Sequence, residues 1–456
     1  MYSRIIFALV ATLTLTPAHA KPADAETAKA LLKASVAIPT VEGRGKVPAL
    51  AALYAATLKQ AGFTDADIVI TPVGETATLA ATLKGRTRGA PVLLLGHMDV
   101  VAADAKDWSR DPFVPVEEGG FVFGRGVEDN KFDIAMMVAT LAQLKRDGFV
   151  PVVDVILVLS GDEETSMATT KLLAAQYKGA AFALNGDAGG GTLGEDGTPL
   201  YYALQAGEKT YADYELSVTN AGGHSSRPGA VNAIAQMARA LDRVGAYRFA
   251  PQSNELTRAA LMTAAGQVDD AALADAMLKF VAHPDDAVAA ATIAAAPEYV
   301  GQIGTTCVPT MVSGGHAANA LPQRATANIN CRIFPGVGIA AVQEELARVI
   351  ADPAITISVK DEPTASDASP LRPDIMAAVA DAVAASWPDI AVVPAMSAGA
   401  TDSLHFRAAG VPSYGVSGLF SKASDSFAHG LNERVPVAAI APALVHYDRL
   451  IRALTK

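Results

Sequence analysis

An uninterrupted apolar run, Pro91 to Leu95, most constrains the fold, because it offers no polar face to water. A strand that is apolar on both faces is stable only where other elements cover both faces. Amphipathic helical periods occur in four nearby segments, at 27–37, 47–61, 132–146 and 169–177. Two more short apolar strands, at 152–160 and 182–185, alternate with these helices. The alternation predicts an α/β fold with a mostly parallel, helix-covered sheet.

The pattern changes after Gly207, where residues 211–219 alternate between apolar and polar side chains. Further strands are predicted near 304–312, 325–334 and 355–360, with helices at 230–244, 267–296 and 339–350. Antiparallel strands with helices indicate a separate α+β unit. We therefore predict one domain from residues 21–207 and 367–456, and an inserted α+β domain from residues 208–366.

The first twenty residues have the order of a secretory signal peptide, with Arg4, an apolar run to Leu15 and Ala18-His-Ala20 at the end. The run is too short to span a bilayer, so we expect cleavage after Ala20 and no membrane association afterwards. A periplasmic or secreted location follows. The net charge of −11 argues against nucleic acid as a partner.

Two cysteines, Cys307 and Cys331, are too few for a disulfide framework. If the strands that carry them pair through a turn near Asn319, the thiols could lie opposite one another. The sequence does not fix the register of this pairing, so a disulfide and two reduced core cysteines both remain open.

Histidines and carboxylates cluster where the predicted strands end or in the adjoining loops. They are His97 with Asp99, Asp129, Glu163 with Glu164, Asp187, and His429. Open α/β sheets bind their ligands at the carboxyl ends of the strands. Imidazole and carboxylate ligands gathered on one rim suit zinc, and cobalt or manganese fit the same set.

Eight segments carry a family resemblance between residues 27 and 452. They are GHMDVV, Trp108 with Asp111-Pro-Phe113, GRGVEDNK, SGDEET, the Asp187 turn, GGHSSRPG, Asn319-Ala-Leu-Pro322 leading to Arg332, and AHGLNE. In this order they resemble the dinuclear zinc exopeptidase family of aminoacylase, carboxypeptidase G, carboxypeptidase S and succinyl-diaminopimelate desuccinylase. GHMDVV and HGLNE look closest to the branch of carboxypeptidase S and N-acyl amino acid hydrolases.

The resemblance implies a two-zinc site with a defined role for each residue. The implied ligands are His97 and Asp187 for one ion, Glu164 and His429 for the other, and Asp129 for both. Asp99 would orient His97, and Glu163 would act as the general base. Two departures stand out: Phe132-Asp133 follows Lys131 where the family has a small residue, and glycines near Asp187 leave Glu195 as an alternative ligand.

The inserted domain supplies the remaining implied residues and is a lid and dimerisation domain in this family. His224 resembles the histidine that reaches the neighbouring subunit and stabilises the tetrahedral oxyanion, which implies a homodimer. Asn319 and Arg332 resemble the residues that hold the substrate carbonyl and carboxylate. An arginine suits the second role because its guanidinium binds a carboxylate through two parallel hydrogen bonds.

The leading hypothesis is a secreted zinc-dependent metallopeptidase that cleaves an amide bond of a short peptide next to a free carboxylate. Two alternatives use the same metals, an N-acyl amino acid amidohydrolase and an aminopeptidase. An alternative of another class, a non-catalytic binding protein, would be expected to lack ligands or the base, whereas this chain keeps all five ligands and Glu163.

Overall fold

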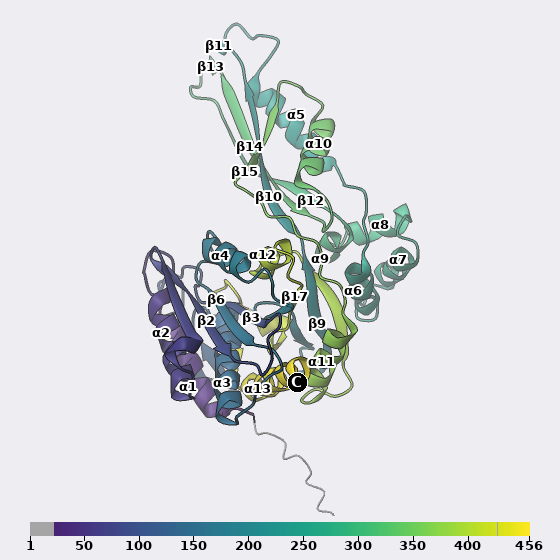
Figure 1. Ribbon diagram of the computed structural model, residues 1–456. Helices are drawn as coiled ribbons and strands as arrows, with labels where there is room; N and C mark the ends of the chain where they lie inside the picture. The colour runs from purple at the N-terminus through teal and green to yellow at the C-terminus, as the bar shows by residue number, and fades with distance from the viewer. Residues whose placement is uncertain (1–21, 426) are drawn as a thin grey trace, which may run out of the picture.

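The computed structural model describes residues 22–425 and 427–456 (Figure 1). The predicted signal peptide lies outside these residues. Among the helices that the structure describes, none has both the length and the hydropathy that a membrane crossing requires.

A ten-stranded sheet with the order β1-β2-β6-β3-β7-β17-β9-β8-β18, and with β16 paired to β9, forms the larger layer. Its strands are β1 Ile68–Val73, β2 Thr76–Leu83, β3 Val92–His97, β6 Val155–Ser160, β7 Phe182–Asn185, β8 Gly190–Leu193, β9 Pro199–Glu208, β16 Ala391–Ser397, β17 Ser413–Gly415 and β18 Phe420–Lys422. The central strands β6, β3, β7 and β17 run parallel. Since β6 and β7 flank β3 on opposite sides, the strand order reverses there, where such sheets bind ligands.

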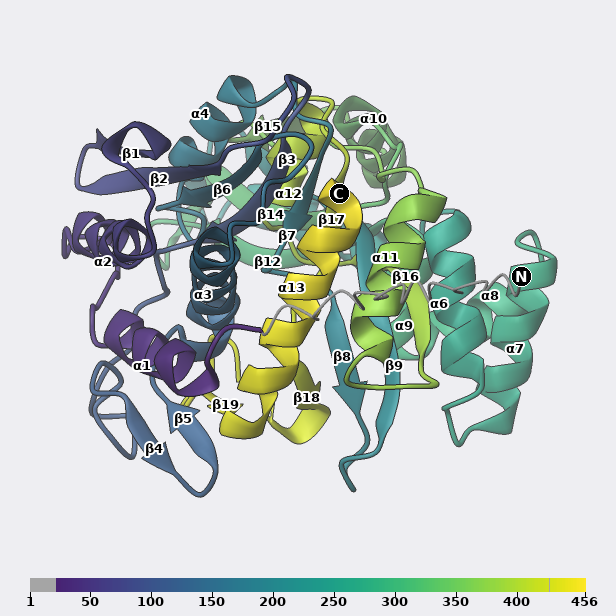
Figure 2. The ribbon, with the colours of Figure 1, turned by 60° about the horizontal axis from the view of Figure 1, so that its bottom comes forward.

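Helices cover both faces of this sheet, as the apolar strand at 92–95 requires. One face carries α1 (Ala25–Val36), α2 (Val47–Gln60), α3 (Phe132–Arg146), α11 (Pro373–Ala384) and α13 (Ile440–Thr455), several of which lie in front of the sheet in Figure 2. The other face carries α4 (Ala168–Gln176) and α12 (Ser403–Ala408). Leu94 packs in the first layer, and its neighbours Leu93 and Leu95 pack in the second. The predicted fold class is confirmed.

A second, four-stranded sheet forms the elongated arm in the upper half of Figure 1. Its antiparallel order is β12-β14-β10-β15, with β10 Thr210–Thr219, β12 Thr306–Gly314, β14 Arg324–Ile333 and β15 Thr356–Lys360. Helices α5 (Ala233–Ala246) and α10 (Ile339–Ile350) pack on one face. Two short strands, β11 (Gly223–His224) and β13 (Ala320–Leu321), pair at the far tip of the arm.

The two cysteines lie on adjacent strands of the arm. Cys307 of β12 is directly opposite Cys331 of β14, and the two residues form a disulfide. Of the two alternatives that the sequence left open, the structure therefore has the disulfide, which joins β12 to β14 covalently.

Four helices follow α5 and precede β12 along the chain: α6 (Glu255–Ala265), α7 (Ala271–Ala282), α8 (Ala287–Ala294) and α9 (Pro297–Val300). They share an apolar core that includes Leu261, Met277 and Phe280. Helix α6 packs against β16 of the ten-stranded sheet, so this part of the predicted insertion contacts the larger layer. The predicted domain boundaries stay a prediction.

The connection from β9 to β10 consists of Lys209 alone.

Candidate metal centre

Three parallel strands deliver the candidate ligands to one edge of the ten-stranded sheet. His97 is the last residue of β3, Glu163 and Glu164 follow β6, and Asp187 lies two residues after β7. With Asp129 and His429, these side chains form three overlapping groups whose possible ligand atoms lie within 4.8 Å of one another. The groups are His97, Asp129 and Asp187; His97, Glu163 and Glu164; and Asp129, Glu164 and His429. Six of the seven residues predicted at the strand ends or in the adjoining loops, all except Asp99, are thus brought together in these groups.

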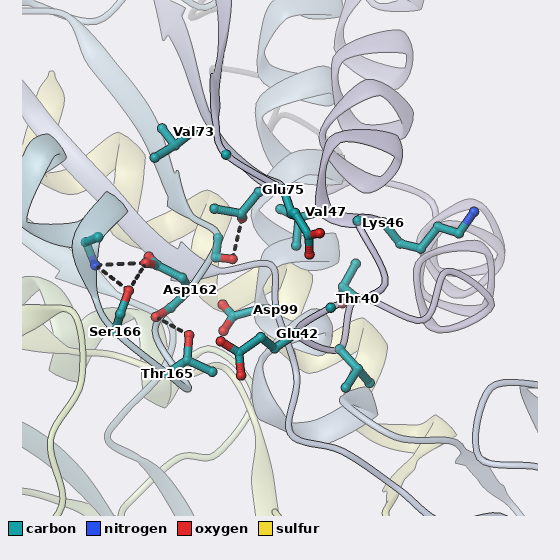
Figure 3. Close-up of a pocket in the computed structure, with 17 residues that line it drawn as sticks. Thr40, Glu42, Lys46, Val47, Val73, Glu75, Asp99, Asp162, Thr165 and Ser166 are labelled. Carbon is teal, nitrogen blue, oxygen red and sulfur yellow. Dashed lines mark hydrogen bonds between the residues drawn. The ribbon is translucent and has the colours of Figure 1, made fainter.

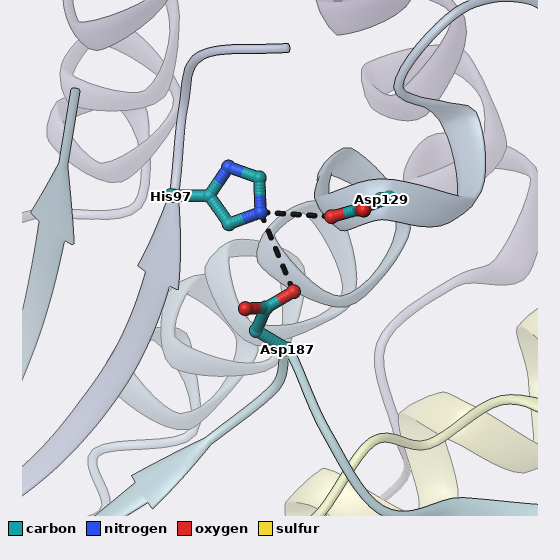
Figure 4. A group of neighbouring side chains, drawn as sticks. All are labelled: His97, Asp129 and Asp187. Carbon is teal, nitrogen blue, oxygen red and sulfur yellow. Dashed lines mark hydrogen bonds and ion pairs between the residues drawn. The ribbon is translucent and has the colours of Figure 1, made fainter. Parts of the chain in front are cut away.

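The Asp129 carboxylate lies between the two imidazoles. Its Oδ1 is 2.8 Å from His97 Nε2, and its Oδ2 is 3.1 Å from His429 Nε2. Asp187 Oδ1 lies 3.3 Å from the same His97 nitrogen (Figure 4). Glu164 Oε1 lies 2.9 Å from His429 Nε2. The residues therefore form two pairs, each of a histidine and a carboxylate, that share Asp129.

Asp99 fixes both His97 and the loop after β6. His97 Nδ1 lies 3.1 Å from the Asp99 carbonyl oxygen and 3.6 Å from its Oδ1, which leaves Nε2 facing Asp129 and Asp187. The Asp99 carboxylate accepts hydrogen bonds from the backbone N–H groups of Glu163 and Glu164, at 3.1 and 3.0 Å. Hydrogen bonds to the backbone of a metal-ligand residue fix the orientation of its side chain.

Glu433 holds the Asp129 loop, a role that the sequence analysis did not predict. Its fully buried carboxylate accepts hydrogen bonds from the backbone N–H groups of Gly126, Glu128 and Asp129 at 2.8, 2.8 and 3.1 Å. Arg125 Nη1 lies 2.6 Å from the same carboxylate. Because Glu433 is four residues beyond His429, it joins the loop of one histidine to the loop of the shared carboxylate. The only signal in the sequence was its place in HGLNE.

Burial and mutual repulsion dominate the electrostatics of the cluster. Burial raises the pKa of Glu163 well above its ordinary value, and the charges of Asp187, Asp402 and Glu164 raise this pKa further. Burial likewise raises the pKa of Asp187 well above its ordinary value, although the contact with His97 opposes this shift. Carboxylates confined in this way ionise together only when a cation compensates them. The imidazole and carboxylate donors fit a divalent transition metal such as zinc.

Asp402 is another buried acid beside the cluster that the sequence analysis missed. It accepts a hydrogen bond from Ser160 Oγ at 2.7 Å, and Ser160 is paired with His97 across β6 and β3. Burial raises the pKa of Asp402 to about 6. No pattern around this residue distinguished it from a helix-capping aspartate, because its partners come from β6 and α4.

The two departures from the family pattern have local explanations. Asp133, which follows the position of the usual small residue, accepts hydrogen bonds from Ser417 Oγ and Tyr447 Oη, both at 2.7 Å, so its buried carboxylate is satisfied. Glu195 does not approach His97 and instead accepts a hydrogen bond from Ser424 Oγ at 2.6 Å. Asp187, not Glu195, is therefore the carboxylate beside His97.

The three residues predicted on the arm fall into two places. Arg332 lies near the ten-stranded sheet, where its Nη1 donates to the Ala398 carbonyl at 2.9 Å and its guanidinium stacks 4.7 Å from the Tyr211 ring centre. His224 and Asn319 are exposed at the tip of the arm, where Ser225 N donates to the Asn319 carbonyl at 3.0 Å. Figure 1 shows this tip far from β3, so a single chain does not bring His224 to the metal-ligand cluster.

A cavity of about 340 Å³ lies beside the loop that follows β6 (Figure 3). Its charged lining is mostly acidic, with Glu42, Glu75, Asp99 and Asp162 against Lys46. The metal-ligand candidates do not line it, whereas Asp99 does. Asp99 is therefore shared by the cavity and the cluster.

The fold and the site define a metalloenzyme of the α/β class. The chain belongs to Peptidase family M20/M25/M40, whose profile matches residues 93–453. This membership confirms the predicted family and makes the protein a metal-dependent hydrolase.

Relatives and solved structures agree with this membership. N-fatty-acyl-amino acid synthase/hydrolase PM20D1 of Bos taurus is 28% identical over 384 residues, covering 78% of this chain and 73% of that protein. Probable carboxypeptidase S-like 2 of Dictyostelium discoideum is 25% identical, covering 80% of this chain and 72% of that protein. An M20 family metallo-carboxypeptidase from Sulfolobus solfataricus shares the fold with a TM-score of 0.70 at 18% identity, over 93% of this chain and 98% of that one.

Glu433→Gln tests the support of the Asp129 loop. An amide leaves one oxygen acceptor for three backbone N–H groups and removes the charge opposite Arg125, so we expect metal affinity to fall about 10- to 100-fold. Chelator competition followed by elemental analysis measures this change. Glu118→Gln, which alters an exposed glutamate paired with Arg110, is the matched control. Unchanged metal retention in Glu433→Gln would show that the loop keeps its geometry without this carboxylate.

Proposed function

We propose that the protein is an exported exopeptidase that holds two zinc ions and hydrolyses an amide bond of a short peptide next to a free carboxylate. The observation that carries the proposal is the position of Asp129, which presents one oxygen to His97 and the other to His429. A carboxylate that faces two ligand sets at once suits a pair of closely spaced cations, because its charge reduces their mutual repulsion.

The ligand assignment follows the two pairs of side chains. His97 and Asp187 would hold one ion, Glu164 and His429 would hold the other, and Asp129 would contribute to both. When bound, such a pair of ions supplies Lewis-acid activation of the scissile carbonyl and of a water molecule. Asp99 keeps Nε2 of His97 directed toward Asp129 and Asp187, the residues with which it would hold a metal.

Glu163 is the proposed general base. Both glutamates lie in the turn after β6, where Glu164 contacts His429, so Glu164 would serve as a ligand while Glu163 remains available for proton transfer. Within the described residues the Glu163 carboxylate accepts no hydrogen bond, yet it lies in one group with His97 and Glu164. It takes a proton from the attacking water and gives it to the leaving nitrogen.

Substrate recognition involves the arm and a second copy of the chain. We assign the substrate carboxylate to Arg332, and the carbonyl and its developing oxyanion to Asn319 and His224 of the partner subunit. Two observations support a homodimer: the exposed position of His224 and Asn319 at the tip, and the edge strand β12. That strand leaves Met311 and Val312 68% and 66% exposed. Apolar residues exposed along an unpaired edge favour contact with another copy.

Export is supported by the signal-like order of residues 1–20 and by the disulfide between Cys307 and Cys331. Disulfides persist in oxidising compartments such as the bacterial periplasm and the extracellular space. We therefore propose a periplasmic or secreted protein.

Hydrolysis of N-acyl amino acids is the second candidate function. A specific observation favours it, the 28% identity over most of both chains to a protein named as an N-fatty-acyl-amino acid synthase/hydrolase. The same ligands, base and carboxylate contact serve either reaction, because both cleave an amide whose nitrogen side ends in a carboxylate. The two functions differ in the pocket for the acyl side.

Product analysis by mass spectrometry separates these functions. The zinc-loaded mature protein is incubated with a tripeptide of three distinguishable residues and with a long-chain N-acyl amino acid, each with and without chelator. We expect chelator-sensitive release of the carboxyl-terminal residue from the tripeptide. Cleavage of the acyl substrate alone would assign the amidohydrolase function, release of the amino-terminal residue would indicate an aminopeptidase, and turnover that survives chelation would contradict a metal-dependent reaction.

Glu163→Gln tests the base. The substitution keeps the shape of the side chain and removes its ability to take a proton, so kcat should fall about 100- to 10,000-fold. Elemental analysis should find the same metal content as in the wild type. Full turnover with both metals retained would remove Glu163 from the mechanism.

Complementation between inactive variants tests the contribution of His224 in trans. His224→Ala and Glu163→Gln homodimers should both be nearly inactive. After the two chains are mixed and reassociated, about one quarter of the wild-type activity should return, since half of the dimers are mixed and each holds one intact site. If His224 acted within its own chain, or if the protein were monomeric, mixing would restore nothing.

A further inference from the structure

Lys209 occupies an unusual position at the junction of the two sheets. It is the single residue between β9 and β10, and its side chain is fully buried. Within the described residues, its ammonium has one hydrogen-bond partner, the Thr306 hydroxyl at 3.4 Å. The backbone is anchored on the ten-stranded sheet, because Lys209 N donates to the Ser397 carbonyl at 3.0 Å. The backbone of Lys209 is thus fixed, while its buried ammonium has only one long hydrogen bond within the described residues.

The other fully buried lysine shows what a satisfied ammonium looks like in this protein. Lys131 Nζ donates to the carbonyl oxygens of Ser35 and Ile38 at 3.1 and 2.8 Å, and the charges of Glu433 and Asp99 act on it favourably. Among the residues that the structure describes, no carboxylate pairs with Lys209 in this way. Its neighbour Glu208 is already paired with Arg407 in the interior.

A second cation, Arg332, lies close to Lys209, because Thr306, whose hydroxyl Lys209 contacts, is directly opposite Arg332 in the pairing of β12 with β14. Burial and this guanidinium lower the pKa of Lys209 to about 8, so the amine still carries its proton at pH 7. Arg332 itself forms no salt bridge with the part of the chain that the structure describes; it donates to the Ala398 carbonyl and stacks on Tyr211. Two neighbouring cations without an anion are unfavourable unless an anionic ligand joins them.

A short loop connects this cation pair to the metal centre. Arg332 contacts the loop at Ala398, and Asp402 at the other end of the loop accepts a hydrogen bond from Ser160, the neighbour of His97. The backbone between Ala398 and Asp402 spans at most roughly 14 Å. The positive pair and the metal-ligand cluster are therefore close enough to act on parts of one small molecule.

We propose that Lys209 supplies the second positive charge of the subsite that selects a free substrate carboxylate, acting together with Arg332. The inference rests on the proposed cleavage next to a carboxylate and adds a specificity-determining residue to it. Lys209 is also the whole connection from β9 to β10, so the proposed subsite lies at the junction between the arm and the ten-stranded sheet.

The test compares a peptide that has a free α-carboxylate with the same peptide as its carboxyl-terminal amide. For Lys209→Met, we expect kcat/KM on the free acid to fall about 10- to 100-fold, because one desolvated charge near the carboxylate is lost. The value on the amide should change less than about twofold. Lys209→Arg should recover most of the preference for the acid. Lys279→Met, which alters an exposed lysine paired with Asp275, is the control and should change neither value.

The outcomes separate this inference from the proposed function. A wild-type protein that does not prefer the acid over the amide would contradict cleavage next to a carboxylate. If the wild type prefers the acid and Lys209→Met keeps the full preference, or loses the same factor on both substrates, only the role of Lys209 is wrong. Should Lys209→Met fail to fold, Lys209→Gln, assayed for inhibition by the free amino acid product and by its amide, gives the same comparison.

Discussion

The concentration of negative charge around two imidazoles is the constraint on which the rest of the structure depends. Asp129, Glu163, Glu164 and Asp187 converge beside His97 and His429, and burial raises the pKa of Glu163 and Asp187 well above their ordinary values. Burial and mutual repulsion of the carboxylates disfavour such a cluster. The surrounding fold must therefore hold these side chains in place until cations balance their negative charge. The parallel centre of the sheet does so by ending three strands at the same edge.

Two further carboxylates hold the cluster without belonging to it. Asp99 accepts the backbone N–H groups of Glu163 and Glu164, and Glu433 accepts three backbone N–H groups around Asp129. A carboxylate that accepts several backbone N–H groups fixes the loop that surrounds it. The ligands therefore lie on loops whose shape is set by hydrogen bonds, which is what precise ligand spacing requires.

The sequence predicted most elements whose signal is local. Helices α3 and α10 and strand β7 have the predicted bounds, because apolar periodicity and flanking glycines mark them directly. The hairpin β1–β2 and the strand β9 were missed, since β1 is half-exposed at the sheet edge and β9 buries polar residues that are satisfied only by distant partners, as in the pair of Glu208 with Arg407. Glu433 and Asp402 escaped prediction for the same reason: their partners lie hundreds of residues away in the chain.

The separation of positive and negative charge at the site favours one binding orientation of a substrate that has a single anionic end. The protein carries a net charge of −11, and the cavity that shares Asp99 with the cluster is lined by Glu42 and Glu75, so a carboxylate is disfavoured on the side of this cavity. Arg332 and Lys209 lie instead at the junction with the arm, at the other end of the 398–402 loop. A molecule with one anionic end is favoured in the orientation that places this end at the junction and its amide at the metal-ligand cluster. On the proposed function, this polarity selects the carboxyl-terminal bond, because the reversed orientation would bring the carboxylate to the acidic side.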